Sequence, residues 1–260
     1  MTLIIGFKCS DGLVVGADSG ATMGDISGLH TVMQPMTKLQ LVSDKAIVGV
    51  SGPVGLWQLY VDCVERIHNQ FRDKDISWIC RSLRDEFRKD AEVAMHMAAM
   101  ATQVLGANAR AGAITTTLVA LAAKDGPHLV QFDCECCPEV TTKDLPFVSI
   151  GSGQIIADPF LAFLRRIFWE NRLPPISDGI FAVVWTLEHA HATAPGGIAP
   201  PITLGVLKME GTQPKARLLS KDELKEHRQV VGQAENHVRE FAQKLRPGAK
   251  ESEPPQPPAG

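Results

Sequence analysis

Residues 2–24 of the chain have the sequence TLIIGFKCSDGLVVGADSGATMG. Within this segment the apolar runs Thr2–Cys9 and Leu13–Ala17 flank Ser10-Asp11-Gly12, a tripeptide that is typical of a tight turn. The residues of Asp18–Pro35, rich in Gly and Thr, predict a long loop after the second run. We therefore expect the chain to begin with a β-meander.

Beyond residue 35 the sequence alternates between runs of strands and runs of helices. Short apolar runs bounded by turn residues predict strands over Lys38–Val42, Lys45–Ser51, Ala113–Ala123, His128–Asp133, Phe147–Ile150, Ile202–Lys208 and Ala216–Leu219. Apolar residues at i, i+3 and i+4 spacing predict helices over Gly52–Ile67, Ile76–Leu105, Ile155–Glu170 and Ser177–Thr193. Alternating runs of this kind favour stacked layers over a βαβ series. We therefore predict an α+β fold, a four-layer αββα sandwich of two sheets between two helical layers.

The end of the chain predicts an added helix and a tail. Ser220 followed by Glu223 forms a capping box, which indicates that a last helix begins there. Pro247 and the segment Glu251–Gly260, with four prolines, predict a disordered tail. We therefore expect one domain over residues 1–245 and a tail over 246–260.

Composition excludes several classes of protein. The net charge of −3 argues against a nucleic-acid binder, which usually carries a basic excess or stripe. No apolar run approaches the roughly 20 residues that a membrane-spanning helix needs, and the N-terminus lacks the basic region of a signal peptide. Three of the six cysteines stand singly in apolar segments, which is typical of reduced thiols in a cytosolic core. The sequence therefore predicts a cytoplasmic protein without nucleic-acid or membrane partners.

Thr2 could act as a nucleophile if Met1 is removed. An initiator methionine is usually removed when the next residue is small. The Thr2 hydroxyl would then lie beside its own α-amine, whose ordinary pKa of about 7.7–8.0 suits a base near neutral pH. A threonine activated by its terminal amine is an established nucleophile-plus-base pair that needs no histidine.

The residues that follow resemble one family of such enzymes. Val14–Gly24 is similar to the strand-and-loop signature of proteasome β subunits, and even more to that of the peptidase of the bacterial HslUV system. The resemblance continues through Lys38, through Ala46–Gly52 with its Ser-Gly pair, and through Ser149-Ile150-Gly151-Ser152-Gly153. It implies the N-terminal-nucleophile hydrolase fold and a threonine endopeptidase that uses no metal or organic cofactor.

The resemblance also implies a role for each matching residue. Thr2 would be the nucleophile, and a buried Asp18 would hold Lys38 in its charged form. The Lys38 ammonium would lower the pKa of the Thr2 hydroxyl, because an opposite charge within ~4–6 Å shifts a pKa by roughly 1–3 units. Ser152 would hydrogen-bond the Thr2 amine and help to move its proton.

Binding of the substrate is implied by the same comparison. The Gly52 amide would form the oxyanion hole, where one such donor is worth about 2.7–4 kcal/mol in other hydrolases. Backbone groups of Thr22 and Ser51 would pair with an extended peptide as an added strand. The implied partners are a peptide or unfolded protein substrate, further copies of the chain in a ring that encloses the sites, and an ATP-dependent unfoldase.

One departure from the family keeps other functions open. Relatives usually carry an Asp and a Ser after the penultimate helix, where this chain has the sequence HATAPGG over residues 191–197, with Thr193 near the Asp position. A non-catalytic ring subunit and an amidase acting on small amides are therefore alternatives. A zinc site at Cys134-x-Cys136-Cys137 is not predicted, because that spacing lacks a C-x₂-C pair and a second ligand pair.

Overall fold

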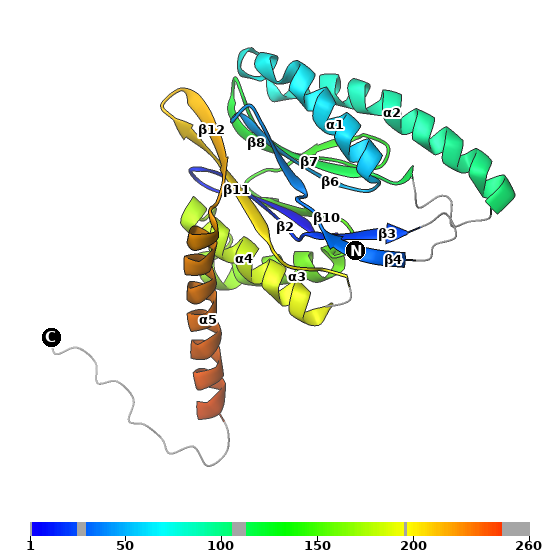
Figure 1. Ribbon diagram of the computed structural model, residues 1–260. Helices are drawn as coiled ribbons and strands as arrows, with labels where there is room; N and C mark the ends of the chain where they lie inside the picture. Colours follow the sequence, from blue (N-terminus) through cyan, green and yellow to red (C-terminus); the bar gives the residue numbers. More distant parts are fainter. Residues whose placement is uncertain (1, 25–29, 106–112, 195–196, 246–260) are drawn as a thin grey trace.

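The computed structural model describes residues 2–24, 30–105, 113–194 and 197–245. These residues form two packed antiparallel sheets with helices on both outer faces (Figure 1). The prediction of an αββα sandwich is thereby confirmed.

The first sheet contains the start of the chain and has the strand order β10-β1-β2-β11-β12. Its strands are β1 (Ile4–Lys8), β2 (Gly12–Ala17), β10 (Phe147–Ile150), β11 (Thr203–Glu210) and β12 (Gln213–Leu218). Strand β1 lies between β10 and β2, so that Ile4 is opposite both Ile150 and Ala17. The N-terminus is therefore held in the interior of a sheet rather than at an edge.

The second sheet has the order β5-β6-β7-β8-β9. Its strands are β5 (Leu39–Val42), β6 (Ala46–Ser51), β7 (Thr116–Ala123), β8 (Gly126–Phe132) and β9 (Pro138–Val140). A separate pair, β3 (Gly20–Gly24) and β4 (His30–Pro35), forms a two-stranded antiparallel sheet. The prediction of a long loop over Asp18–Pro35 was wrong, and β9 was not predicted.

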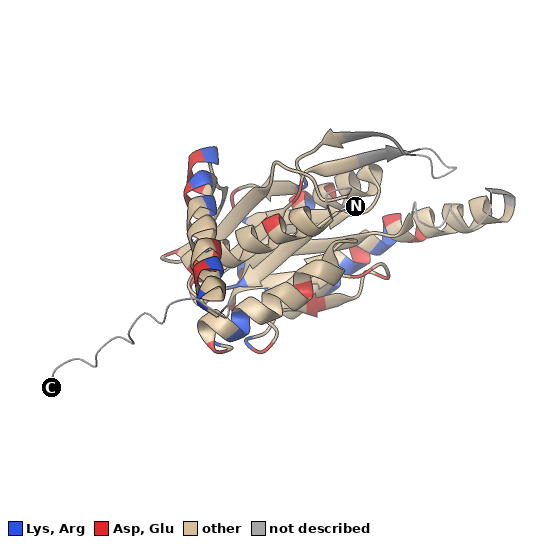
Figure 2. Ribbon diagram, turned by 90° about the horizontal axis from the view of Figure 1, so that it is seen from below, with Lys and Arg blue, Asp and Glu red and all other residues tan. Residues whose placement is uncertain are grey.

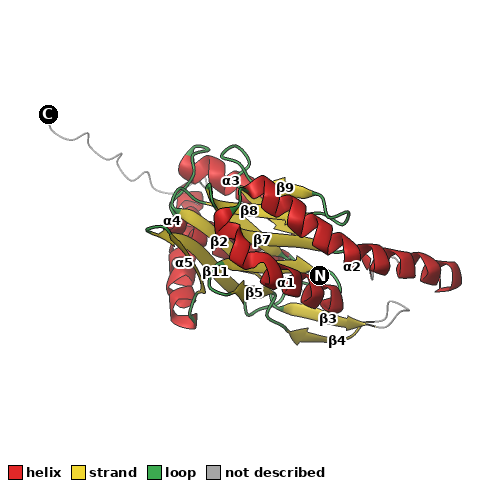
Figure 3. Cartoon of the chain, turned by 90° about the horizontal axis from the view of Figure 1, so that it is seen from above, coloured by secondary structure: helices red, strands yellow, loops and turns green. Residues whose placement is uncertain are grey.

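Helices cover both outer faces of the sandwich. The structure has α1 (Val54–Ile67), the short 3-10 helix η1 (His68–Asp73), α2 (Ile76–Leu105), α3 (Gln154–Trp169), α4 (Ile176–Thr193) and α5 (Lys221–Lys244). Helices α1 and α2 lie across the β5–β9 sheet, and the end of α2 extends past its edge (Figure 3). Helices α3 and α4 cover the first sheet, and α5 packs on α4.

The core explains why β1 up to Phe7 and the whole of β2 carry no polar side chain. Successive side chains of a strand point to opposite faces. Ile4 and Val15 therefore lie in the cluster between the two sheets, whereas Ile5 and Val14 lie in the cluster under α3 and α4. A strand buried on both faces has a continuous apolar sequence rather than an alternating one.

The predicted helices agree closely with the observed ones. Helix α2 has the predicted bounds, and the capping box is present, with the Ser220 side chain accepting from the Glu223 amide. The predicted tail over 246–260 lies outside the described residues. No helix in the described part of the chain is long and apolar enough to cross a bilayer.

Candidate active site

The start of the chain is fixed by backbone contacts on both sides. The Gly153 amide donates to the Thr2 carbonyl oxygen (3.0 Å), and the Asp18 amide donates to the Leu3 carbonyl oxygen (3.1 Å). Gly151 has φ +93°, and a Cβ there would lie 2.3 Å from the Thr2 carbonyl oxygen. Only glycine therefore lets the Gly151–Gly153 turn approach Thr2 so closely.

Asp18 is the point at which several segments meet. It follows β2 and is fully buried. Its Oδ1 accepts from the Leu3 amide (2.9 Å) and from Lys38 Nζ (2.6 Å), and its Oδ2 accepts from the amides of Gly20 (2.9 Å) and Ala199 (3.3 Å). A buried carboxylate needs such partners, because leaving it unpaired would cost several kcal/mol.

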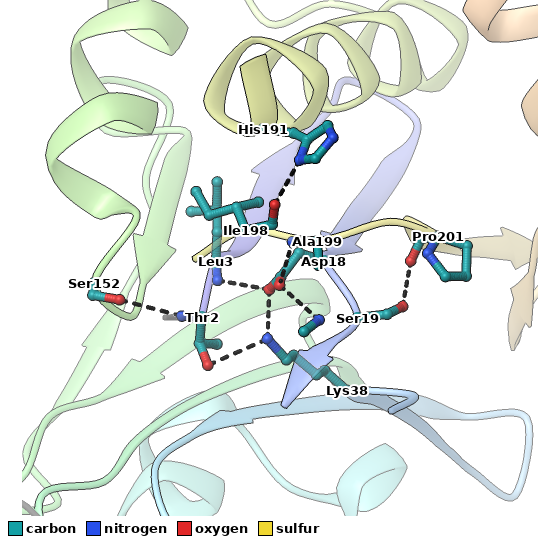
Figure 4. Close-up of polar contacts among 11 residues, drawn as sticks. Thr2, Leu3, Asp18, Ser19, Lys38, Ser152, His191, Ile198, Ala199 and Pro201 are labelled. Atoms are coloured by element: carbon teal, nitrogen blue, oxygen red, sulfur yellow. Dashed lines mark hydrogen bonds and ion pairs between the residues drawn. The ribbon is translucent and has the colours of Figure 1, made fainter. Parts of the chain in front are cut away.

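Lys38 joins this carboxylate to the side chain of Thr2. It lies just before β5 and is 5% exposed, with its Nζ 3.3 Å from Thr2 Oγ1. Burial lowers the pKa of Lys38 below its ordinary value, and the nearby charge of Asp18 opposes that shift. The arrangement presents a cationic donor to the Thr2 hydroxyl, as Figure 4 shows.

Ser152 reaches Thr2 from the other side. The Thr2 backbone nitrogen donates to Ser152 Oγ (3.2 Å), and Ser152 belongs to the turn between β10 and α3 (Figure 4). The nitrogen and the hydroxyl of one threonine thus contact two different polar side chains. Such an arrangement suits proton transfer between the two atoms of Thr2.

Thr2 opens into a cleft of about 310 Å³. The polar residues that line it are Thr2, Lys38, Ser51, Gly52 and Ser152. Gly52 has φ +148°, and a Cβ there would lie 2.8 Å from the Ile114 carbonyl oxygen. The predicted site residues Thr2, Lys38, Ser51, Gly52 and Ser152 are therefore brought together, with Asp18 buried behind Lys38.

The remaining lining of the cleft is mostly apolar. It consists of Met36, Val50, Val54 and Trp57, with Gly20 and Ala21 of β3. Thr22 lies in β3 opposite Met33 of β4, which places its backbone one residue beyond the described lining. This apolar lining suits an uncharged substrate group.

The segment after α4 reaches the site through its backbone. Thr193 is exposed, and its hydroxyl donates to the His189 carbonyl oxygen in its own helix. The contact with Asp18 comes instead from the Ala199 amide, and His191 Nδ1 contacts the Ile198 carbonyl oxygen next to it (2.6 Å). Sequence reasoning missed this contact, because a backbone amide has no residue type by which to recognise it.

Several solved structures of proteins called Anbu have the same fold. A Gly-1 mutant of Anbu from Hyphomicrobium sp. strain MC1 has a TM-score of 0.67 and 18% identity, and the match covers 95% of this chain and 98% of that one. Anbu, or ancestral beta-subunit, from Yersinia bercovieri has a TM-score of 0.65 and 15% identity, with 96% and 100% covered. A structure described as the helical assembly of the Anbu complex from Pseudomonas aeruginosa has a TM-score of 0.68 and 15% identity, with 96% and 100% covered.

The sequence itself matches one family. A search of curated proteins found no match. The family model described as "Proteasome subunit" matches residues 2–164, which include β1, Asp18, Lys38, Gly52 and Ser152. This chain belongs to the proteasome subunit family.

Proposed function

We propose that the chain is an N-terminal threonine peptidase, in which Thr2 becomes the first residue after removal of Met1. The observation that carries the proposal is the position of the Thr2 hydroxyl, 3.3 Å from Lys38 Nζ and facing a cleft that Gly52 also lines. Lys38 is in turn paired with the buried Asp18. In this proposal Thr2 is the nucleophile, Lys38 is the cation beside it, and the Gly52 amide is the backbone donor for the oxyanion.

The mechanism forms an ester and then hydrolyses it. The Thr2 amine takes the hydroxyl proton, and Oγ1 attacks the carbonyl carbon of the substrate while the Lys38 cation stabilises the charge that develops on Oγ1. The Gly52 amide donates to the oxygen of the tetrahedral intermediate. The protonated amine then gives its proton to the leaving nitrogen, and the C–N bond breaks to leave an acyl-enzyme ester on Thr2.

Hydrolysis of the ester completes the cycle. The Thr2 amine takes a proton from water, whose oxygen attacks the ester carbonyl. The acid product leaves as Oγ1 recovers a proton. In this mechanism Ser152, whose Oγ accepts from the Thr2 nitrogen, relays this proton between the amine and the reacting oxygens.

The cleft favours an extended peptide as the substrate. Gly20 and Ala21 of β3 and the Ser51-Gly52 segment all line the cleft, and we propose that their backbone groups pair with an added strand. The side chain of the residue before the cleaved bond would enter the apolar part lined by Met36, Val50 and Trp57. We therefore propose a preference for apolar residues at that position.

The proposal includes assembly with further copies of the chain. The related Anbu complex of Pseudomonas aeruginosa forms a helical assembly. Large apolar side chains are exposed on α1, α2, α3 and α5, and exposed apolar surface of this kind can serve as a contact between copies. They include Val93, Met97 and Met100 on α2, Ile155, Phe163 and Ile167 on α3, and Val238 and Phe241 on α5. A ring that encloses the sites and an unfoldase partner stay predictions.

The test compares Thr2→Ala and Thr2→Ser with the wild type on fluorogenic peptides and on small amides. We expect Thr2→Ala to lose activity by roughly 10⁴-fold or more, as hydrolases do without their nucleophile. Thr2→Ser keeps a hydroxyl beside the amine and should retain measurable turnover. Cleavage of small amides alone would favour the amidase. If a wild type without Met1 cleaves neither kind of substrate, the result would favour a non-catalytic subunit. The absence of the family's carboxylate after α4 also supports that alternative.

A further inference from the structure

His191 lies outside the reaction cleft but contacts the segment that holds Asp18. It belongs to the last turn of α4 and is half-buried. Its Nδ1 is 2.6 Å from the Ile198 carbonyl oxygen, and since a carbonyl only accepts, the ring nitrogen is the donor. The next peptide nitrogen along the chain, that of Ala199, donates to Asp18 Oδ2 (3.3 Å). Figure 4 shows the two contacts on either side of the same peptide.

The peptide between Ile198 and Ala199 is therefore oriented by one hydrogen bond at each end. A peptide unit is planar, so the direction of its carbonyl fixes the direction of its N–H. A donor at the carbonyl thus aims the N–H at Asp18. The Ala199 carbonyl oxygen in turn accepts from the Ser19 amide (2.9 Å), which ties the segment to the residue after Asp18.

We propose that His191 is a positioning residue for catalysis, which holds the Ile198–Ala199 peptide so that Asp18 stays aligned on Lys38. This inference rests on the proposed function. The chain of contacts runs from His191 through the Ala199 amide to Asp18, then from Lys38 to Thr2 Oγ1. The segment after α4 thereby supports the site through a backbone amide and a histidine rather than through a carboxylate.

The contact is insensitive to the charge of His191. The neutral ring with its proton on Nδ1 and the fully protonated ring both have an Nδ1–H to donate. His191 also lines a cavity of about 210 Å³, which the ion-paired Glu188 of α4 and Arg228 of α5 line as well. The role therefore depends on the donor atom, not on the ionisation of the ring.

The experiment compares three variants. His191→Leu removes the donor, and His191→Asn keeps an amide N–H near the position of Nδ1. His189→Leu is the matched control: His189 is also half-buried on α4, but its ring stacks on Phe160, 4.2 Å between centroids, and faces a different part of the molecule. If His191 contributed only to stability, His191→Leu and His189→Leu would have the same kcat and the same Lys38 titration.

Two measurements are made on each variant. The first is kcat and KM with a fluorogenic peptide. We expect His191→Leu to lower kcat by about 10- to 100-fold with little change in KM, because misplacing a catalytic group by about 1 Å costs that much. His191→Asn should recover most of kcat, and His189→Leu should match the wild type.

The second measurement does not depend on turnover. Lys38 Nζ is titrated by nitrogen NMR in the wild type and in each variant. If Asp18 moves away from Lys38, its charge stabilises the ammonium less. The pKa of Lys38 should therefore fall in His191→Leu and return to the wild-type value in His191→Asn. If His191→Leu titrates and turns over like His189→Leu, the inference is overturned while the proposed function stands. If the wild type is inert, the titration alone decides the role of His191.

Discussion

Asp18 accepts hydrogen bonds from four separate segments of the chain. Three backbone amides and one ammonium donate to its two oxygens, and they come from the N-terminus, from β3, from the segment before β5 and from the segment after α4. Its full burial means that these partners are needed for the folded state as well as for the chemistry. Stability and the proposed catalysis therefore share one residue.

The lowered pKa of Lys38 leads to a prediction about pH. Burial lowers that pKa below the ordinary value of about 10.4, so folded Lys38 loses its proton before an exposed lysine does. Without the cation, negative charge on Thr2 Oγ1 is less stable, so kcat/KM should fall on the alkaline side. In the same pH window the unfolded chain binds more protons than the folded one. The contribution of Lys38 to the free energy of unfolding should therefore rise with pH there.

Asp18→Asn tests the cause of that alkaline limb. Asp18 opposes the lowering of the Lys38 pKa, so removal of its charge should move the limb to lower pH. Asp158→Asn is the control, since Asp158 contacts Ser149 and Gln154 instead of Lys38. A pH profile of kcat/KM for the three proteins provides the check. An alkaline limb at the same pH in Asp18→Asn and in the wild type would contradict the assignment to Lys38.

At the scale of elements, the sequence predicts helices better than it predicts the small sheet. Helix α2 was predicted with its observed bounds because Ile79, Leu83 and Phe87 repeat at helical spacing and are all buried. Strands β3 and β4 were missed because Gly20–Gly24 is short and Gly-rich, without the alternation that marks a half-buried strand. They pair with each other and not with either large sheet, so no long apolar run was required of them.

The resemblance to the family predicted the side chains of the site and the backbone groups of the cleft, but not the backbone donor after α4. Thr2, Asp18, Lys38 and Ser152 match the family's motifs, and the structure brings them together. The Ala199 amide contributes an N–H that every residue except proline has. No sequence pattern marks such a donor, because its position depends on the path of the chain after α4.

Two glycines near the start of α1 should respond differently to replacement by alanine. Gly52 has φ +148°, and a Cβ would lie 2.8 Å from a backbone oxygen, whereas a Cβ at Gly55 in α1 would have open space around it. Gly52→Ala should therefore destabilise the fold by more than ~1 kcal/mol and displace the amide that we propose binds the oxyanion. Gly55→Ala should stabilise the helix by roughly 0.5–1 kcal/mol.

Urea unfolding and peptide hydrolysis of the two alanine variants separate these effects. Gly52→Ala should lose most of its kcat, and Gly55→Ala should stay within about two-fold of the wild type, since a change that strains no backbone leaves the site in place. Equal activity of the two variants would mean that the Gly52 amide has no part in the reaction. Equal stability would mean that the positive φ at Gly52 is not required by the fold.

At the scale of the whole molecule, the sandwich brings the start of the chain in one sheet close to the end of a strand in the other. Thr2 precedes β1, an interior strand of the first sheet, and the cleft is completed by Ser51 at the end of β6 and by Gly52 just after it. Charges of both signs alternate along α2 and α5 instead of forming a single-sign face (Figure 2). The apolar side chains exposed on the helices are therefore the best candidates for contacts between copies.

The central claim is that Thr2 is the nucleophile, and covalent labelling tests it most directly. The purified chain is incubated with a threonine-directed β-lactone or epoxyketone, and its intact mass and labelled peptide are measured by mass spectrometry. We expect a wild-type chain without Met1 that gains one inhibitor mass on Thr2, and a Thr2→Ala chain that gains none. A wild type that lacks Met1 yet stays unlabelled, or equal labelling of Thr2→Ala, would contradict the claim.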